Sequence, residues 1–178
     1  MADEIILEQT EVPPPGDPSE QPETVESTPV ELPPERQYCI FRANRDRYCM
    51  SVLEIEEVVE WPKITPVPLA PDFLVGIFNL RGAIVPVVDV AVNQGRRFDS
   101  ALKKIVVGFM PAPEGQGYVR IGIAADEVIG TCTTTEEVIT DEIPAEVPHC
   151  CGLLRMGEKL ALAIDLARVA EVFPIPVI

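Results

Sequence analysis

The sequence predicts an all-β protein, either a sandwich or a barrel. After residue 36, short apolar runs are interrupted by turn residues at regular spacing, which is typical of that class. The clearest of these runs, residues 118–125, alternates and places Val119, Ile121 and Ile123 on one face. With 178 residues and 47% hydrophobic content, the chain can bury one ordinary core or two small cores packed together.

The first 36 residues differ in composition from the rest of the chain. They hold ten of the 29 acidic residues, one basic residue and eight prolines. Such a segment cannot bury enough apolar surface to offset the entropy lost when a chain becomes ordered. We therefore expect a disordered, acidic, proline-rich tail over residues 1–36 and a folded domain over residues 37–178.

The first strands are predicted from short apolar runs with turns between them. Residues 51–61 are ambiguous, because Val52, Ile55 and Val59 keep helical spacing in a segment rich in β-branched residues. We expect a short helical turn there that runs into a strand. The remaining strands are predicted at residues 37–43, 103–110 and 118–125, with a hairpin loop at residues 111–117.

A hairpin is predicted over residues 76–90 (GIFNLRGAIVPVVDV). Asn79 and Gly82 supply turn chemistry, because glycine is free to adopt a positive φ, and the flanking runs are too apolar to be loops. Pro86 cannot donate a ladder hydrogen bond, so its strand should be an edge or carry a bulge. Runs of consecutive apolar residues are typical of strands covered on both faces, which places this hairpin between two packed units. Arg81 can be read as a surface turn residue that pairs with Asp89 or another nearby acid.

An internal similarity supports the idea of two units. Residues 76–90 align with residues 152–166, so that Gly76 matches Gly152 and Asp89 matches Asp165. Apolar residues match at most positions between them. The alignment predicts two related β units, each with a hairpin of the same construction.

The charge distribution argues against nucleic acid and anionic membranes as partners. Affinity for phosphates comes mainly from lysine and arginine, and the basic residues cluster only as Arg96-Arg97 and Lys103-Lys104 in a chain of net charge −15. The sequence has no secretory signal pattern and no uninterrupted run of about 18 apolar residues that could span a bilayer. We expect a cytoplasmic protein without membrane insertion.

The run His149-Cys150-Cys151 is the main candidate for thiol or metal chemistry. It holds the single histidine and two of the five cysteines. A structural zinc site needs four converging ligands, and no second cysteine and histidine cluster supplies the other two. An odd number of cysteines in apolar surroundings favours reduced, buried thiols. We expect no catalytic residues, metal or cofactor, and keep a thiol or metal protein as the less favoured alternative.

The hairpin region carries a family resemblance. Residues 73–90 (FLVGIFNLRGAIVPVVDV) closely resemble the signature of CheW-like chemotaxis coupling proteins, in which an N-L-R-G turn follows a glycine and precedes an apolar strand with P-V and D. Residues 64–73 resemble the approach to that signature, residues 37–61 the opening strands, and residues 152–169 the closing hairpin. The resemblance covers about residues 37–173.

The resemblance implies a fold and a role. The fold would be two five-stranded Src-homology-3-like barrels, packed and intertwined, with short helical segments. Such proteins have no catalysis. They are adaptors that couple the cytoplasmic tips of chemoreceptors to the regulatory domain of the histidine kinase CheA, in a two-component array at the membrane. The receptor tip lies in the groove between the barrels.

The resemblance also assigns residues. Arg81 matches the arginine implicated in receptor coupling, and Gly76, Asn79 and Gly82 match the signature hairpin. Further interpretations stay open: an adaptor of a type IV pilus, gliding or other non-swimming chemosensory pathway, an adaptor of a non-motility signalling system, and a detached kinase regulatory domain. The positions matched to the apolar lining of the receptor groove are Ile55, Val58, Ile64 and Val67.

Overall fold

The computed structural model describes residues 34–92, 103–112, 117–140 and 143–173. The chain divides into two units, Met1–Leu32 and Pro33–Ile178, and the first lies outside the described residues. The expected tail over residues 1–36 therefore stays a prediction. No helix in the described ranges is long and apolar enough to cross a membrane.

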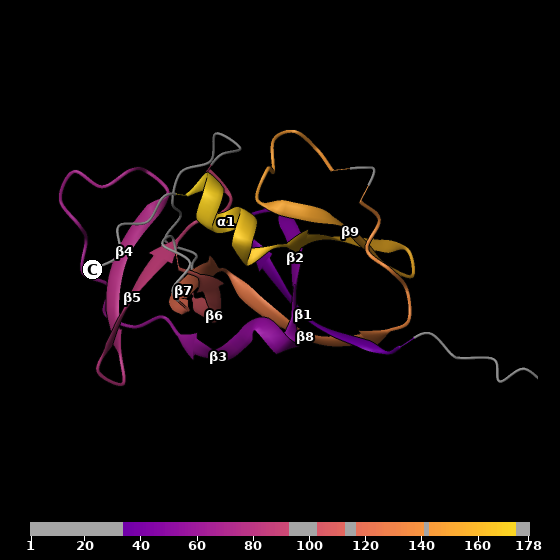
Figure 1. Ribbon diagram of the computed structural model, residues 1–178, viewed down its shortest axis with the longest axis horizontal. Helices are drawn as coiled ribbons and strands as arrows, with labels where there is room; N and C mark the ends of the chain where they lie inside the picture. The colour runs from indigo at the N-terminus through magenta and orange to yellow at the C-terminus, as the bar shows by residue number, and fades with distance from the viewer. Residues whose placement is uncertain (1–33, 93–102, 113–116, 141–142, 174–178) are drawn as a thin grey trace, which may run out of the picture. The chain divides into compact units, whose positions relative to one another are not determined.

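Within these ranges, ten strands form two five-stranded sheets (Figure 1), which confirms the predicted all-β class. Sheet A has the order β8-β1-β2-β10-β9, and sheet B has the order β3-β6-β7-β5-β4. The elements are β1 (Arg36–Ala43), β2 (Asp46–Ser51), the 3-10 helix η1 (Val52–Glu54), β3 (Ile55–Glu60), β4 (Leu74–Leu80), β5 (Ala83–Val88), β6 (Lys104–Pro111), β7 (Tyr118–Ala125), β8 (Glu127–Thr134), β9 (Cys150–Met156), β10 (Lys159–Ile164) and the helix α1 (Leu166–Val172).

The two sheets exchange strands between the halves of the chain. Sheet A combines β1 and β2 from the first half with β8, β9 and β10 from the second half. Sheet B combines β3, β4 and β5 with β6 and β7. A parallel pair joins the halves in each sheet, β10 with β2 and β5 with β7. Sheet B is therefore one contiguous stretch of sequence from β3 to β7, whereas the strands of sheet A come from both sides of that stretch.

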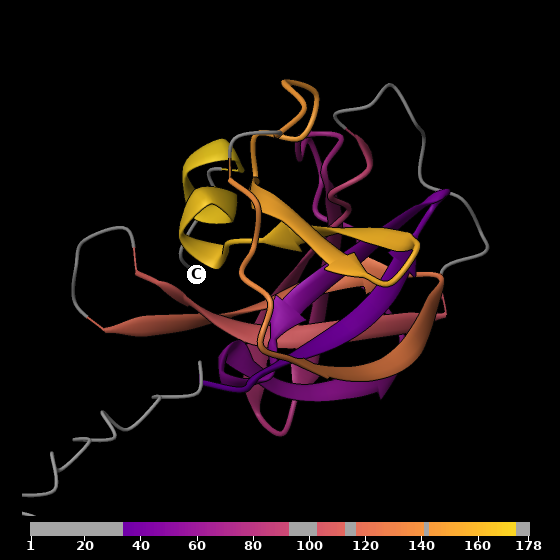
Figure 2. The same cartoon turned by 90° about the vertical axis from the view of Figure 1, so that its right-hand side faces the viewer.

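Three apolar clusters form the core. One lies inside sheet A and one inside sheet B, and each draws on all five strands of its sheet, as in a Src-homology-3-like fold. The edge strands are not hydrogen-bonded to each other among the described residues, so neither sheet closes into a complete barrel. The third cluster lies between the sheets and includes residues of α1, which is held against β6 and β9 (Figures 1 and 2).

Strand β5 shows why the signature hairpin is so apolar. Val87 belongs to the cluster inside sheet B and Val88 to the cluster between the sheets, and both are fully buried. The prediction of a strand covered on both faces is confirmed. The expectation for Pro86 is corrected, because β5 lies between β7 and β4 rather than at an edge, and the bulge lies in β4. The proline is tolerated because parallel pairing with β7 starts at Val87.

The two aligned glycines have the same environment, which supports the internal similarity. A Cβ at Gly76 would strike the carbonyl oxygen of Thr65, and a Cβ at Gly152 would strike that of Ile139. In both sheets the incoming segment forms an isolated bridge with the residue after the glycine. The close approach of two backbones therefore requires glycine at both positions.

The two aligned aspartates also have matching contacts. Oδ1 of Asp89 accepts a hydrogen bond from the Ala91 amide at 2.9 Å, and Oδ1 of Asp165 accepts one from the Ala167 amide at 2.8 Å. Asp165 is thereby the N-cap of α1. The helical turn predicted before a strand is present as η1 followed by β3.

Candidate protein-binding site

The turn between β4 and β5 has two consecutive residues with positive φ. Arg81 has φ 51° and Gly82 has φ 92°, the pattern of a type I′ hairpin turn. Oδ1 of Asn79 accepts a hydrogen bond from the Gly82 amide at 2.9 Å and closes the turn. The positive φ of Gly82 was expected, whereas that of Arg81 was not. A left-handed conformation is uncommon for an arginine.

Arg81 pairs with an acid on β3, the strand at the opposite edge of sheet B from β4. Its side chain is 77% exposed, and Nη2 donates a hydrogen bond to Oε2 of Glu57 on β3 at 2.9 Å. The sequence predicted that Arg81 pairs with Asp89 or with another nearby acid, and in the structure that acid is Glu57. The second carboxylate oxygen of Glu57 is buried and accepts no hydrogen bond from the residues that the structure describes.

A second ion pair lies next to the first. Nε and Nη2 of Arg120 donate to the two oxygens of Glu56, at 2.5 and 2.8 Å. These bonds lower the pKa of Glu56, and the charges of Arg120 and Arg81 contribute in the same direction. The Arg120 guanidinium also lies over the ring of Phe109, 5.5 Å from its centroid. The charged hairpin is thus connected to an aromatic residue of β6.

Phe109 lines a groove of about 670 Å³, which we call the inter-sheet groove. Its walls come from η1, from β6 and β7 of sheet B, and from the start of α1. Leu53 on η1 is 96% exposed and Tyr118 on β7 is 74% exposed, so two large apolar side chains face solvent here. The lining residues are Leu53, Glu54, Phe109, Pro111, Tyr118, Asp165, Leu166 and Ala167.

Gly108 fixes the floor of the inter-sheet groove. A Cβ at this position would lie 2.7 Å from the Glu54 carbonyl oxygen and 2.9 Å from Cδ1 of Leu166. The missing side chain lets η1 and α1 approach β6 closely. Burial raises the pKa of Glu54, the charge of Asp165 adds to the increase, and a hydrogen bond with the Ser51 backbone opposes it.

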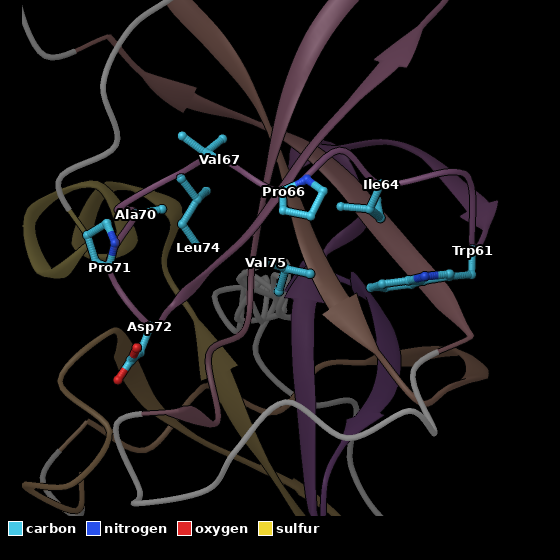
Figure 3. A pocket seen from close by; sticks show the side chains of 9 residues that line it. All are labelled: Trp61, Ile64, Pro66, Val67, Ala70, Pro71, Asp72, Leu74 and Val75. Carbon is cyan, nitrogen blue, oxygen red and sulfur yellow. The ribbon is translucent and has the colours of Figure 1, made fainter.

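A second groove lies along the connection between β3 and β4, and we call it the β3–β4 groove (Figure 3). Its volume is about 500 Å³. Trp61 and Ile64 lie at one end, and Val67, Ala70 and Pro71 lie at the other (Figure 3). The surface is largely apolar and has one charged lining residue, Asp72.

The structure separates the four apolar positions that the resemblance assigned to one groove. Ile64 and Val67 line the β3–β4 groove, while Ile55 packs against the cluster between the sheets. Val58 lies on β3 and is 40% exposed. The inter-sheet groove was not found from the sequence, because its walls come from four separate segments. The available signal was a large apolar residue beside a turn, at Leu53 and at Tyr118.

His149 and Cys150 are fully buried in the core. Burial lowers the pKa of His149 to about 4 and raises that of Cys150 to about 12, so both are neutral at pH 7. The imidazole packs against the rings of Phe173 and Tyr48, with centroids 5.6 and 6.1 Å away. Its two nitrogens have no hydrogen-bond partner among the described residues, so it behaves as an apolar core side chain.

Comparison with known families tests the resemblance that the signature hairpin carries. The family model described as the CheW-like domain matches residues 37–173, a range that includes both grooves and the Arg81 turn. The chain belongs to the CheW-like domain family. This confirms the resemblance drawn from the N-L-R-G hairpin.

Several curated relatives of the CheW-like chain are chemotaxis proteins. The chemotaxis protein CheW of Thermotoga maritima is 31% identical, over 74% of this chain and 85% of its own length. That of Klebsiella aerogenes is 27% identical, over 75% of this chain and 81% of its own length. Protein FrzA of Myxococcus xanthus is 27% identical over 54% of this chain and 58% of its own length.

A solved structure shows the same fold as the CheW-like chain. The crystal structure of the scaffolding protein TtCheW from Thermoanaerobacter tengcongensis superposes with a TM-score of 0.63, over 78% of this chain and 89% of that chain. Sequence identity between the two is 23%. The likeness confirms the double five-stranded architecture.

Proposed function

We propose that this chain is a chemosensory adaptor, which couples the cytoplasmic tips of chemoreceptors to the regulatory domain of the histidine kinase CheA. The single observation that carries this proposal is the N-L-R-G hairpin with its exposed Arg81. Membership of the CheW-like family and relatives named as chemotaxis proteins support it. The adaptor would act in the cytoplasm at receptor arrays.

The inter-sheet groove is proposed to hold the receptor tip. Leu53 and Tyr118 offer apolar surface that a helical hairpin can cover, and exposed apolar patches of this kind mark interaction sites. Arg81 is connected to the groove through the ion pairs on β3 and the ring of Phe109. A guanidinium has five donors in a rigid plane, so Arg81 can bridge to carboxylates or carbonyls of a receptor helix. Ile55 and Val58, on the same strand as Glu57, belong to this contact surface in our proposal.

The β3–β4 groove is proposed as a second contact surface. Ile64 and Val67 line this groove and are not among the lining residues of the inter-sheet groove. We assign this apolar surface to the kinase regulatory domain. An adaptor needs two surfaces of this kind, because receptor and kinase are bound at the same time.

The test is receptor-dependent activation of the kinase in reconstituted arrays. Arg81→Ala should keep the fold and the kinase contact but weaken receptor coupling by about tenfold or more, since interface arginines beside apolar pockets are frequent hot spots. Arg155→Ala is a matched control, because Arg155 is an exposed arginine on the hairpin of sheet A. Activation by Arg81→Ala equal to the wild type would contradict the proposal.

The second candidate is an adaptor of a type IV pilus or gliding pathway. The similarity to Protein FrzA is the observation that favours it. Deleting the gene in its own host and scoring swimming and surface motility separately tells the two candidates apart. Loss of swimming alone supports the first, and loss of surface motility alone supports the second.

A further inference from the structure

The charged side chains that line the inter-sheet groove are all of one sign. Its two charged lining residues, Glu54 and Asp165, are both acidic, and no lysine or arginine of the described residues lines it. The rest of the lining is aliphatic, aromatic or proline. A partner segment that docks here therefore meets carboxylates in partly desolvated, apolar surroundings, where charge interactions are stronger than in water.

The two carboxylates differ in how they are compensated. Asp165 accepts hydrogen bonds from the Ala167 and Arg168 amides at 2.8 and 3.4 Å, and Nε of Arg168 lies 4.0 Å from its Oδ2. Glu54 has no ion pair with any cation of the described residues, and its carboxyl contact is to the Ser51 backbone. Asp165 thus has a cation of the chain beside it, whereas among the described residues the only compensation for Glu54 is its hydrogen bond with the Ser51 backbone.

Two cations beside lining residues of the groove are already engaged. Arg120 is held by two hydrogen bonds to Glu56 and by the ring of Phe109. Nη1 of Arg168 donates to the Cys150 carbonyl oxygen at 2.9 Å. Neither can turn to Glu54 without breaking these contacts. The half-buried carboxylate is left for a cation that comes from outside the chain.

We propose that the partner segment seated in the inter-sheet groove carries a lysine or arginine that pairs with Glu54, next to an aliphatic residue that covers Leu53. This inference rests on the proposed function and narrows it, since it states the chemistry of the receptor segment. Electrostatic complementarity of this kind selects partners and fixes their register. An acidic residue at the same place would meet two carboxylates and be repelled.

The experiment measures binding of a purified receptor tip fragment from the same genome to the full chain. Glu54→Gln should weaken binding about fivefold and Glu54→Lys about tenfold or more, by loss of the pair and then by repulsion. Glu146→Lys is the matched control, because Glu146 is exposed and lines neither groove. Melting curves of each variant check that the fold is kept, because the Glu54 carboxylate also contacts the backbone of Ser51, the N-cap of η1.

A charge exchange identifies the partner residue. Each basic residue of the tip fragment is replaced in turn by glutamate, and one of these fragments should restore binding to Glu54→Lys. Carboxyl NMR of Glu54 should also show a lower pKa in the complex than in the free chain, which a merely structural role would not produce. Wild-type affinity in both Glu54 variants would overturn this inference alone. A wild-type chain that binds no tip fragment would overturn the proposed function together with it.

Discussion

Arg81 and Gly157 occupy equivalent positions in two hairpins of the same construction. Each lies five residues after a glycine that contacts an incoming backbone segment, Gly76 or Gly152, and each has a left-handed conformation, with φ 51° and 63°. Glu57, the ion-pair partner of Arg81, also has a glycine at the equivalent position in the other half of the chain. Glu57 follows the bulge of β3, and Gly130 follows the bulge of β8. Sheet A therefore lacks both members of the ion pair found in sheet B.

Arg81→Gly should preserve the fold and remove receptor coupling. Glycine relieves the left-handed strain of a side chain, and an exposed ion pair contributes little to stability, so the melting temperature should stay within about 3 °C of the wild type. Arg81→Lys should rescue coupling in part, because a point charge cannot replace the planar fork. Melting curves and kinase activation in the same preparation check this. If receptor coupling is lost only in variants that have also lost their fold, Arg81 is an ordinary turn residue without a role in receptor binding.

Acid should destabilise the protein through His149. The pKa is about 4 in the folded chain and 6.5 in the unfolded chain, so the unfolded state binds a proton first as the pH falls. Stability is unaffected by this group above pH 6.5 and is lost between pH 6.5 and 4, by about 3 kcal/mol in total.

His149→Phe is the variant that isolates this effect. Phe73 occupies the equivalent position in the other half of the chain and also packs on Phe173, with ring centroids 4.9 Å apart. The variant should be more stable than the wild type, and the difference should grow from pH 7 to pH 4.5 in denaturant titrations. A difference that does not change with pH would refute the assignment.

Gly152→Ala should prevent folding or lower stability by several kcal/mol. The new methyl group would overlap the Ile139 backbone, which cannot move without breaking its bridge to Leu153. Gly157→Ala is the control, because no atom lies within 4 Å of its added Cβ, and only the left-handed φ costs about 1 kcal/mol. Chemical denaturation of both variants measures this. Equal losses would mean that the close approach does not explain the glycine, because Gly152 itself has no left-handed φ.

Val87→Asp should abolish folding rather than weaken binding. The position is fully buried, and an unpaired carboxylate there costs several kcal/mol. Ile84→Asp lies on the same strand, where the side chain is half exposed, and should be tolerated. The measurement is the yield of cooperatively melting protein for each variant. A folded Val87→Asp protein would contradict the assigned core.

Removal of residues 1–33 should leave the melting temperature unchanged within a few degrees. A terminal segment of this composition contributes little packing to a folded domain. Its acidic residues should still reduce binding to acidic partners by repulsion, and added salt should shrink that difference. A large drop in the melting temperature would show that the segment packs on the domain.

The parts of the fold that depend on local chemistry were predictable from the sequence. Gly76 and Gly152 with their aspartates thirteen residues later identified two equivalent hairpins, and the apolar run around Val87 identified a strand buried on both faces. The N-L-R-G turn identified Arg81 as exposed. These features are set by residues that are neighbours in sequence.

The parts that depend on distant contacts were not predictable. Glu57 is 24 residues from Arg81, and no local pattern marks it as the partner. The inter-sheet groove needs Leu53, Phe109, Tyr118 and α1 to meet, and strand exchange between the halves brings them together. Pro86 suggested an edge strand because the sequence does not show where parallel pairing starts.

The exchange of strands between the two halves has a consequence for how the molecule assembles. Sheet A cannot form until β10 is available to β2, so folding is dominated by contacts of large sequence separation and should be slow during synthesis. The exchange of strands also indicates how the domain arose. A single half, with two strands of one sheet and three of the other, could complete its sheets only with a second copy of itself. The strand order of this domain is the arrangement expected of a strand-swapped homodimer whose two copies were joined into one chain.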